Sequence, residues 1–149
     1  SLVNNDEGRF LNLYNGKIRV VDYKTGKPEN AKKKLNPPVP NTDITTHSFE
    51  EVYGGDYWRQ ALFYKLLMDY DGNRDWEMVA AEFDFVEPDK KTKQYITHKL
   101  PIHSADIESV KEQVKYAYTN IKNHNFNKGC GNDDCEWCNF IKFNKINLV

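Results

Sequence analysis

The pattern of hydrophobic and polar positions predicts a β-hairpin in the first part of the chain. Residues 9–14 and 17–24 are rich in apolar and β-branched side chains, and each segment has the length of a short strand. Asn15-Gly16 separates them and is typical of the two-residue turn between antiparallel strands. Residues 4–8 are polar and predict a further turn before the hairpin.

Two more strands are predicted in the middle of the chain. Residues 79–86 place apolar side chains at every second position, with acidic side chains between them. This alternation is the pattern of a half-buried strand. Residues 87–91 form a polar turn, and we expect residues 92–100 to form the next strand.

Two helices are predicted from the spacing of apolar positions. The first begins with Asp56 as its N-cap and runs to Tyr70, where Asp71-Gly72 stops it. We expect this helix to be largely buried, because it carries two apolar stripes: Trp58, Leu62 and Leu66, and Phe63, Leu67 and Tyr70. Ser104 caps the second helix, whose apolar face consists of Ile107, Val110, Val114 and Ile121.

Residues 27–53 predict a long loop inserted between the hairpin and the first helix. Lysine, proline, asparagine and threonine dominate this stretch, and Pro37, Pro38 and Pro40 exclude a regular element around them. Loops of this length in compact domains are usually functional or disordered. A flap beside the active face is the use that we expect for it.

Composition limits the chain to one domain. With 149 residues, 39% hydrophobic and 13% aromatic, residues 1–149 support a single α/β domain in which helices flank a small mixed sheet. The formal charge of −1 means that nucleic-acid binding must come from a local patch. The strongest such patch is Lys27, Lys32, Lys33 and Lys34, which also reads as a solvated segment. Neither a membrane span nor a signal peptide is evident, so we expect a cytoplasmic protein.

Candidate chemistry lies in the second hairpin strand, at Asp22 and Lys24. A strand alternates faces with period two, so these charges project from one face while Val21 and Tyr23 project from the other. A carboxylate can hold a divalent cation, and a neighbouring lysine can orient a water or stabilise charge on an attacked phosphate. The same pair also occurs as an ordinary surface ion pair at a strand end.

A second pair lies in the predicted helix. Gln60 and Tyr64 are four residues apart, so an amide and a phenol share one helix face. Taken alone, the spacing also fits a core tyrosine beside a solvated glutamine.

The ordered set of motifs resembles the RecB-like branch of the PD-(D/E)XK nuclease superfamily, as found in the nuclease domain appended to UvrD/Rep-type helicases. The matching segments are Val20-Val21-Asp22-Tyr23-Lys24-Thr25-Gly26, Gly54-Gly55-Asp56-Tyr57-Trp58-Arg59-Gln60, Tyr64, and the cysteine-containing tail at 129–140. The resemblance extends from about Gly16 to Phe140. It implies a restriction-endonuclease-like core.

The resemblance also implies roles for individual residues. Asp22 is expected to ligate Mg²⁺ or Mn²⁺, with the backbone carbonyl of Tyr23 as a second oxygen ligand, and Lys24 to be the catalytic lysine. Gln60 and Tyr64 are expected to line the site and to contact DNA or order Lys24. The expected function is metal-dependent DNA cleavage, more exonucleolytic than endonucleolytic, in a helicase–nuclease of DNA repair or recombination.

One family feature is missing. Such nucleases usually carry another metal-ligating Asp, followed by Arg, on the strand before the Asp-x-Lys strand, but Gly8 stands before Arg9 here. An earlier helical acid or histidine is also not evident. We therefore expect the sequence to be the N-terminally shortened piece of a longer protein. The alternative is a catalytically incomplete module that binds single-stranded DNA or docks on a helicase.

Three cysteines, Cys130, Cys135 and Cys138, lie in the tail at 125–149 with C-x4-C-x2-C spacing. This spacing is compatible with zinc or with an iron–sulfur cluster. His124 is a candidate fourth zinc ligand, whereas a cluster would need a ligand from outside the sequence. Reduced cysteines that pack as small hydrophobes are the third alternative.

Overall fold

A computed structural model describes residues 2–5, 8–71, 75–125 and 134–143 of the chain. Its five strands form one sheet in the order β1-β2-β3-β4-β5. All neighbouring strands are antiparallel except β3 and β4, which are parallel, so the sheet is mixed as predicted. The strands are β1 (Leu2–Asn5), β2 (Gly8–Tyr14), β3 (Lys17–Lys24), β4 (Glu77–Phe85) and β5 (Thr97–Pro101).

The predicted hairpin is confirmed. Tyr14 pairs with Lys17 across a two-residue turn in which both Asn15 and Gly16 have positive φ angles, 48° and 76°. Positive φ at both turn positions matches the right-handed twist of the flanking strands. A Cβ atom on Gly16 would lie 2.5 Å from the carbonyl oxygen of Asp75, so the site also needs glycine for space. Strand β1 was not predicted.

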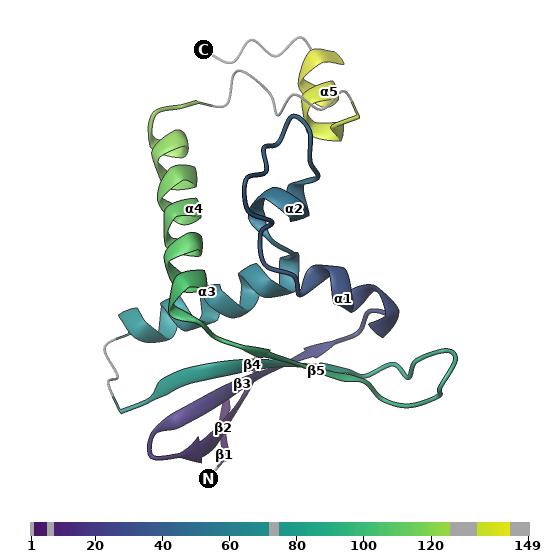
Figure 1. The fold of residues 1–149 in the computed structure, drawn as a ribbon, viewed down its shortest axis with the longest axis vertical. Coiled ribbons are helices and arrows are strands. Elements are labelled where there is room, and N and C mark those ends of the chain that lie inside the picture. The colour runs from purple at the N-terminus through teal and green to yellow at the C-terminus, as the bar shows by residue number, and fades with distance from the viewer. Residues whose placement is uncertain (1, 6–7, 72–74, 126–133, 144–149) are drawn as a thin grey trace.

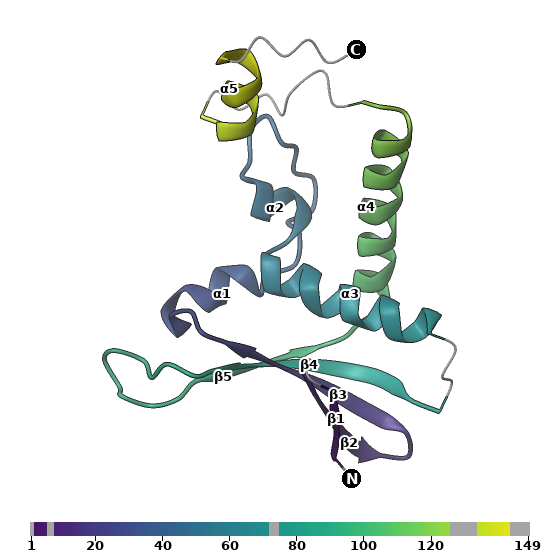
Figure 2. The same cartoon turned by 180° about the vertical axis from the view of Figure 1, so that it is seen from behind.

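The helices lie on one side of the sheet. Figures 1 and 2 show α3 lying across the sheet, with α2 and α4 extending away from α3 and α5 at the far end from the strands. The parallel pair β3 and β4 requires a crossover, and η1 to α3 supply it. The helices are η1 (Pro28–Asn30), α1 (Ala31–Lys34), α2 (Phe49–Tyr53), α3 (Asp56–Tyr70), α4 (Ser104–Lys122) and α5 (Glu136–Phe143).

The core has two parts, one on each side of α3. Ala61 of α3 packs against the sheet, where Ile18, Val20, Phe83 and Phe85 are buried. On the other side, α3 packs against α4 through Trp58, Leu62, Leu66 and Val110. Helix α3 is therefore the central element, and its sheet-facing side determines what can meet the end of β3.

The bounds of α3 are as predicted, but two details of the helix predictions were wrong. The N-cap of α3 is Gly55, with Asp56 as the first helical residue, and the N-cap of α4 is His103, with Ser104 as its first residue. Asp56 instead places its negative charge in the first turn, where the helix dipole favours it.

The second apolar stripe of α3 was also expected to be buried, and it is not. Phe63, Leu67 and Tyr70 are 46%, 55% and 79% exposed. Helix α4 meets α3 at Val110 but then leads away from the sheet, so its later apolar residues Val114 and Ile121 are 43% and 61% exposed. The pattern gave the apolar positions correctly, but it could not indicate how far two helices run side by side.

The stretch at 27–53 was predicted to be a loop, but it is not wholly irregular. Residues 35–48 hold no helix or strand, in agreement with the three prolines, but short helices lie on both sides. Ser48 and Glu51 form a capping box at the start of α2, in which each side chain bonds to the backbone N–H of the other. The bonds from Ser48 lower the pKa of the Glu51 carboxyl, because they favour its charged form.

Strand β5 is shorter at its start than predicted and includes Pro101 at its end. Residues 92–96 belong to the connection from β4, where the Asp89 side chain accepts hydrogen bonds from the backbone N–H groups of Lys91 and Thr92. This turn closes by a backbone bond from Lys93 N–H to the Asp89 carbonyl. Among the described helices, none is long and apolar enough to cross a membrane.

Candidate active site

Strand β3 delivers Asp22 and Lys24 to the sheet face that α3 covers. In the parallel pairing with β4, Asp22 lies beside Phe83 and Lys24 beside Phe85, both of which are core residues. The two charged side chains are only 15% and 17% exposed. They lie at the end of the strand, where the apolar run of β3 gives way to Thr25-Gly26.

Helix α3 brings Gln60 and Tyr64 to the same place. The Lys24 ammonium donates hydrogen bonds to Asp22 Oδ2 at 3.1 Å and to Gln60 Oε1 at 2.7 Å. The Tyr64 hydroxyl donates to Asp22 Oδ2 at 2.9 Å, and Gln60 Nε2 donates to the Tyr64 oxygen. The four residues thus form a closed ring of hydrogen bonds, which we call the Asp22–Lys24 cluster.

Aromatic side chains hold Lys24 from a further side. Its ammonium lies 4.8 Å from the centroid of the Tyr57 ring and 5.4 Å from that of Phe83. Those two rings stack on each other with centroids 5.0 Å apart, and Phe83 is fully buried. A cation over an aromatic face is attracted by the ring quadrupole. Lys24 therefore has one preferred position, set by Asp22, Gln60 and these rings.

Tyr57 and Phe83 were missed as site residues, although signals for both exist. Phe83 was predicted as a strand residue that points to the core, and Tyr57 lies in the segment that carries the family resemblance. Their place beside Lys24 follows from the pairing of β3 with β4 and from the packing of α3, which are contacts between distant parts of the chain.

Of the four lysines predicted to contact DNA, Lys34 lies next to the cluster. Its ammonium is 5.1 Å from the centroid of the Tyr57 ring. The close approach of α1 to the start of α3 places it there, because a Cβ atom on Gly55 would lie only 2.3 Å from the Lys34 carbonyl oxygen. Lys27, Lys32 and Lys33 are exposed, and no described contact joins them to the cluster.

Asp43 and His98, which lie away from the cluster, are among the titratable groups whose pKa values are shifted. Hydrogen bonds from the side chains of Thr45 and then Thr46 lower the pKa of Asp43 to about 2, and these bonds form a turn before α2. Burial lowers the pKa of His98 on β5, and the charge of Lys32 lowers it further. His98 packs edge-on against Phe85, so it serves the core.

The cluster offers a limited oxygen set for a metal ion. Both of these hydrogen bonds to Asp22 end on Oδ2, which leaves Oδ1 as a possible metal ligand. Mg²⁺ is commonly held by one or two carboxylates together with water and substrate phosphates. Asp22 therefore fits a hydrated ion shared with a phosphate, although the described residues contain no group of three His, Cys, Asp or Glu side chains that could hold a metal.

A second carboxylate is absent at the positions that flank Asp22. On β2, Arg9 pairs with Val21, so the next position of this register brings Gly8 opposite Asp22. On β4, Glu82 and Asp84 project to the other face of the sheet, where Glu82 pairs with Arg19 at 2.8 Å and Asp84 accepts a bond from Thr97. The Asp that the resemblance led us to expect before Arg9 would therefore lie opposite Asp22, where this chain has Gly8.

Tyr23 and the tail residues do not join the cluster through any side-chain contact that the structure describes. The Tyr23 side chain projects to the opposite face of the sheet from Asp22 and is 47% exposed, and its carbonyl remains a predicted ligand. Cys130 lies outside the described residues. Cys135 and Cys138 are partly exposed at α5, and His124 is exposed just after α4, so a metal at the tail remains a prediction.

Comparison with protein families identifies the class of this domain. A model of the PD-(D/E)XK nuclease superfamily matches residues 12–143, a range that includes the whole Asp22–Lys24 cluster. The chain belongs to the PD-(D/E)XK nuclease superfamily. No curated protein and no solved structure matches the chain significantly. The mixed sheet flanked by helices agrees with the restriction-endonuclease-like core expected from the sequence.

Proposed function

We propose that this domain is a metal-dependent DNA nuclease that hydrolyses phosphodiester bonds at the Asp22–Lys24 cluster. The observation that carries the proposal is the ring of hydrogen bonds joining Asp22, Lys24, Gln60 and Tyr64 in a chain of this superfamily. A partly buried ammonium with one preferred position beside a carboxylate is suited to act on a phosphate and on the water that attacks it.

Each residue has a separate task in this proposal. Lys24 orients the attacking water and stabilises the negative charge that develops on the phosphate oxygens. Gln60 holds the Lys24 ammonium, and Tyr64 holds Asp22 Oδ2, which would leave Oδ1 to ligate a cation. Mg²⁺ or Mn²⁺, when bound by Asp22, supplies Lewis-acid polarisation of the phosphate. Hydrolysis leaves a 5′-phosphate and a 3′-hydroxyl.

The finer assignment, a RecB-like nuclease domain joined to a UvrD/Rep-type helicase in DNA repair or recombination, is also a proposal. Its support is the segment at 54–60 and the cysteine tail at 129–140, which resemble that branch of the superfamily. An exonuclease is favoured over an endonuclease on the same resemblance. A helicase, in the same chain or in a partner, is the expected associate.

The alternative is a module that keeps the nuclease fold and binds DNA without cutting it. The observation in its favour is Gly8, which leaves Asp22 without a carboxylate on the neighbouring strand. Introducing a carboxylate at position 8 distinguishes the nuclease from the binding module. The Cβ atoms of residues directly opposite each other in an antiparallel pair are about 5 Å apart, so the Gly8→Asp side chain can reach the same cation as Asp22.

The test is cleavage of end-labelled linear single-stranded and double-stranded DNA with Mg²⁺, Mn²⁺ or EDTA. Lys24→Ala is expected to abolish cleavage, and Lys115→Ala, an exposed lysine on α4, to leave it unchanged. Gly8→Asp is expected to lower the Mg²⁺ concentration needed for half-maximal rate. Circular dichroism checks that each variant folds. Cleavage that survives in Lys24→Ala, or none in either the natural chain or Gly8→Asp, would contradict the nuclease proposal.

A further inference from the structure

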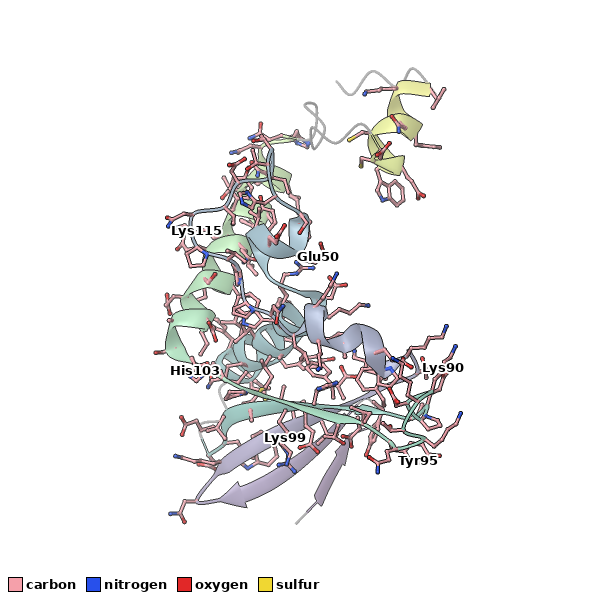
Figure 3. The ribbon with its side chains drawn as sticks, turned by 45° about the vertical axis from the view of Figure 1, so that its right-hand side comes forward. Glu50, Lys90, Tyr95, Lys99, His103 and Lys115 are labelled. Carbon is pink, nitrogen blue, oxygen red and sulfur yellow. The ribbon has the colours of Figure 1, made fainter. Side chains whose placement is uncertain are left out.

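A groove runs along α3 on the side that α2 and α4 flank. It encloses about 550 Å³, within the range of roughly 300–1,000 Å³ of pockets that hold small ligands. Figure 3 shows α2, marked by Glu50, and α4, marked by Lys115, both on the α3 side of the sheet. The groove is lined by Phe49, Tyr53, Arg59, Gln60, Phe63, Val110, Gln113, Val114, Tyr116 and Ala117.

Aromatic side chains form a large part of this groove, and three of them are partly exposed to solvent. Phe49, Phe63 and Tyr116 are 51%, 46% and 64% exposed. Apolar surface gathered in a concave site on a protein usually marks a binding surface. Because the three rings come from α2, α3 and α4, the groove can present ring faces to a flat ligand from more than one side.

The groove connects with the Asp22–Lys24 cluster through Gln60. Gln60 is one of the residues that line the groove, and its side-chain Oε1 accepts the hydrogen bond from Lys24 Nζ at 2.7 Å. A molecule in the groove is therefore one side chain away from the proposed reacting centre.

The lining places no negative charge against an anionic chain. Arg59 is the charged residue among those that line the groove, and none of the lining residues is acidic. Its guanidinium lies 4.7 Å from the centroid of the Phe49 ring and also pairs with Asp56 just outside the groove. Gln113, whose Nε2 donates to the Tyr53 carbonyl at 3.0 Å, adds an amide oxygen that can meet the edge of a base.

We infer that this groove binds unpaired bases of the DNA strand that lies across the Asp22–Lys24 cluster, so that the domain prefers a single strand. Bases stack on aromatic side chains whatever their sequence, and an arginine beside the ring adds to the attraction. In a duplex the base faces are covered by their neighbours, so a duplex cannot fill the groove without flipping a base. The location of the site rests on the proposed function, but base binding can be measured without cleavage.

The test compares strands that differ in bases alone. A fluorescein-labelled oligothymidylate and a labelled abasic strand of the same length are titrated with the protein in the presence of Ca²⁺. A gel run afterwards checks that neither strand was cleaved. We expect the oligothymidylate to bind roughly tenfold more tightly than the abasic strand. Phe63→Ala and Tyr116→Ala should remove this difference, Phe63→Tyr should keep it, and Tyr70→Ala, an exposed tyrosine of α3 outside the groove, should not change it.

The two proposals fail in different ways. Equal affinity for both strands overturns the base-binding groove and is the result expected if the groove accepts a protein helix instead. Discrimination that survives in Phe63→Ala and Tyr116→Ala also overturns it, because the bases then bind elsewhere. Metal-dependent cleavage that accompanies equal affinity leaves the nuclease proposal standing. Discrimination between the strands without cleavage supports the groove and counts against the nuclease.

Discussion

At the scale of single residues, the cluster depends on how Lys24 is held. Its ammonium lies close to the Asp22 carboxylate, the Gln60 amide oxygen and the rings of Tyr57 and Phe83. Period two in the strand predicted that Asp22 and Lys24 share a face, and the i,i+4 spacing in the helix predicted the same of Gln60 and Tyr64. That Gln60 meets Lys24 was expected from the family resemblance alone. Tyr57 could not be predicted in this role, because its position depends on how α3 packs on Phe83.

Tyr57 should act as a positioning residue for Lys24. Cation–π attraction amounts to about 0.5–2 kcal/mol, so Tyr57→Leu is expected to lower kcat by about 2- to 30-fold with little change in KM. Tyr57→Phe keeps the ring and should restore most of the rate. Steady-state cleavage kinetics measure both constants. An equal loss of rate in the Leu and Phe variants, or a loss in KM alone, would contradict this role.

At the scale of elements, two glycines let α1, α2 and α3 meet. Gly54 has a φ angle of 84°, and a Cβ atom there would lie 2.5 Å from the Trp58 ring. At Gly55 the φ angle of −72° is one that any residue adopts. Glycine is required there only for space, because a Cβ atom would collide with the backbone of Lys33 and Lys34. The short helices around these glycines were missed in the sequence, although the Ser48–Glu51 capping box is a local signal for α2.

Gly55→Ala tests this close approach. The added methyl group must push α1 away from α3, and overpacking of this kind costs about 1–3 kcal/mol. Gly26→Ala is the matched control, since no atom lies within 4 Å of a Cβ atom at that position. Urea-induced unfolding, followed by tryptophan fluorescence, gives both free energies of unfolding. Equal stability of the two variants would show that α1 is not packed against Gly55.

At the scale of the whole molecule, the individual strands and helices were easier to predict than the extent of their contacts. The hairpin and the bounds of α3 follow from local signals, namely Asn15-Gly16 and the helical spacing from 56 to 70. The exposed stripe at Phe63, Leu67 and Tyr70 did not follow, because apolar spacing does not tell which neighbour covers a face. That stripe contributes Phe63 to the groove beside the cluster.

Charge is also distributed unevenly over the molecule. The net charge is −1, yet residues 27–34 carry four lysines and one acid, and residues 87–93 carry three lysines and two acids. A hydrogen bond of 3.3 Å from the Lys90 backbone to Glu29 joins these segments, and Figures 1 and 2 place α1 and the β4–β5 connection at one end of the sheet. Figure 3 shows Lys90 and Tyr95 on that connection.

This basic end of the sheet should make DNA binding salt-dependent. Each phosphate that a lysine neutralises contributes about 0.7 to the slope of log affinity against log salt for a single strand, and about 0.9 for a duplex. Replacing Lys33 and Lys91 by serine is therefore expected to reduce the slope by up to two such contributions. The matched pair Lys115→Ser and Lys122→Ser removes the same charge from α4 and should leave the slope unchanged. Fluorescence anisotropy with oligothymidylate over a KCl series measures both slopes, and identical slopes in the two pairs would mean that the strand does not cross the basic end.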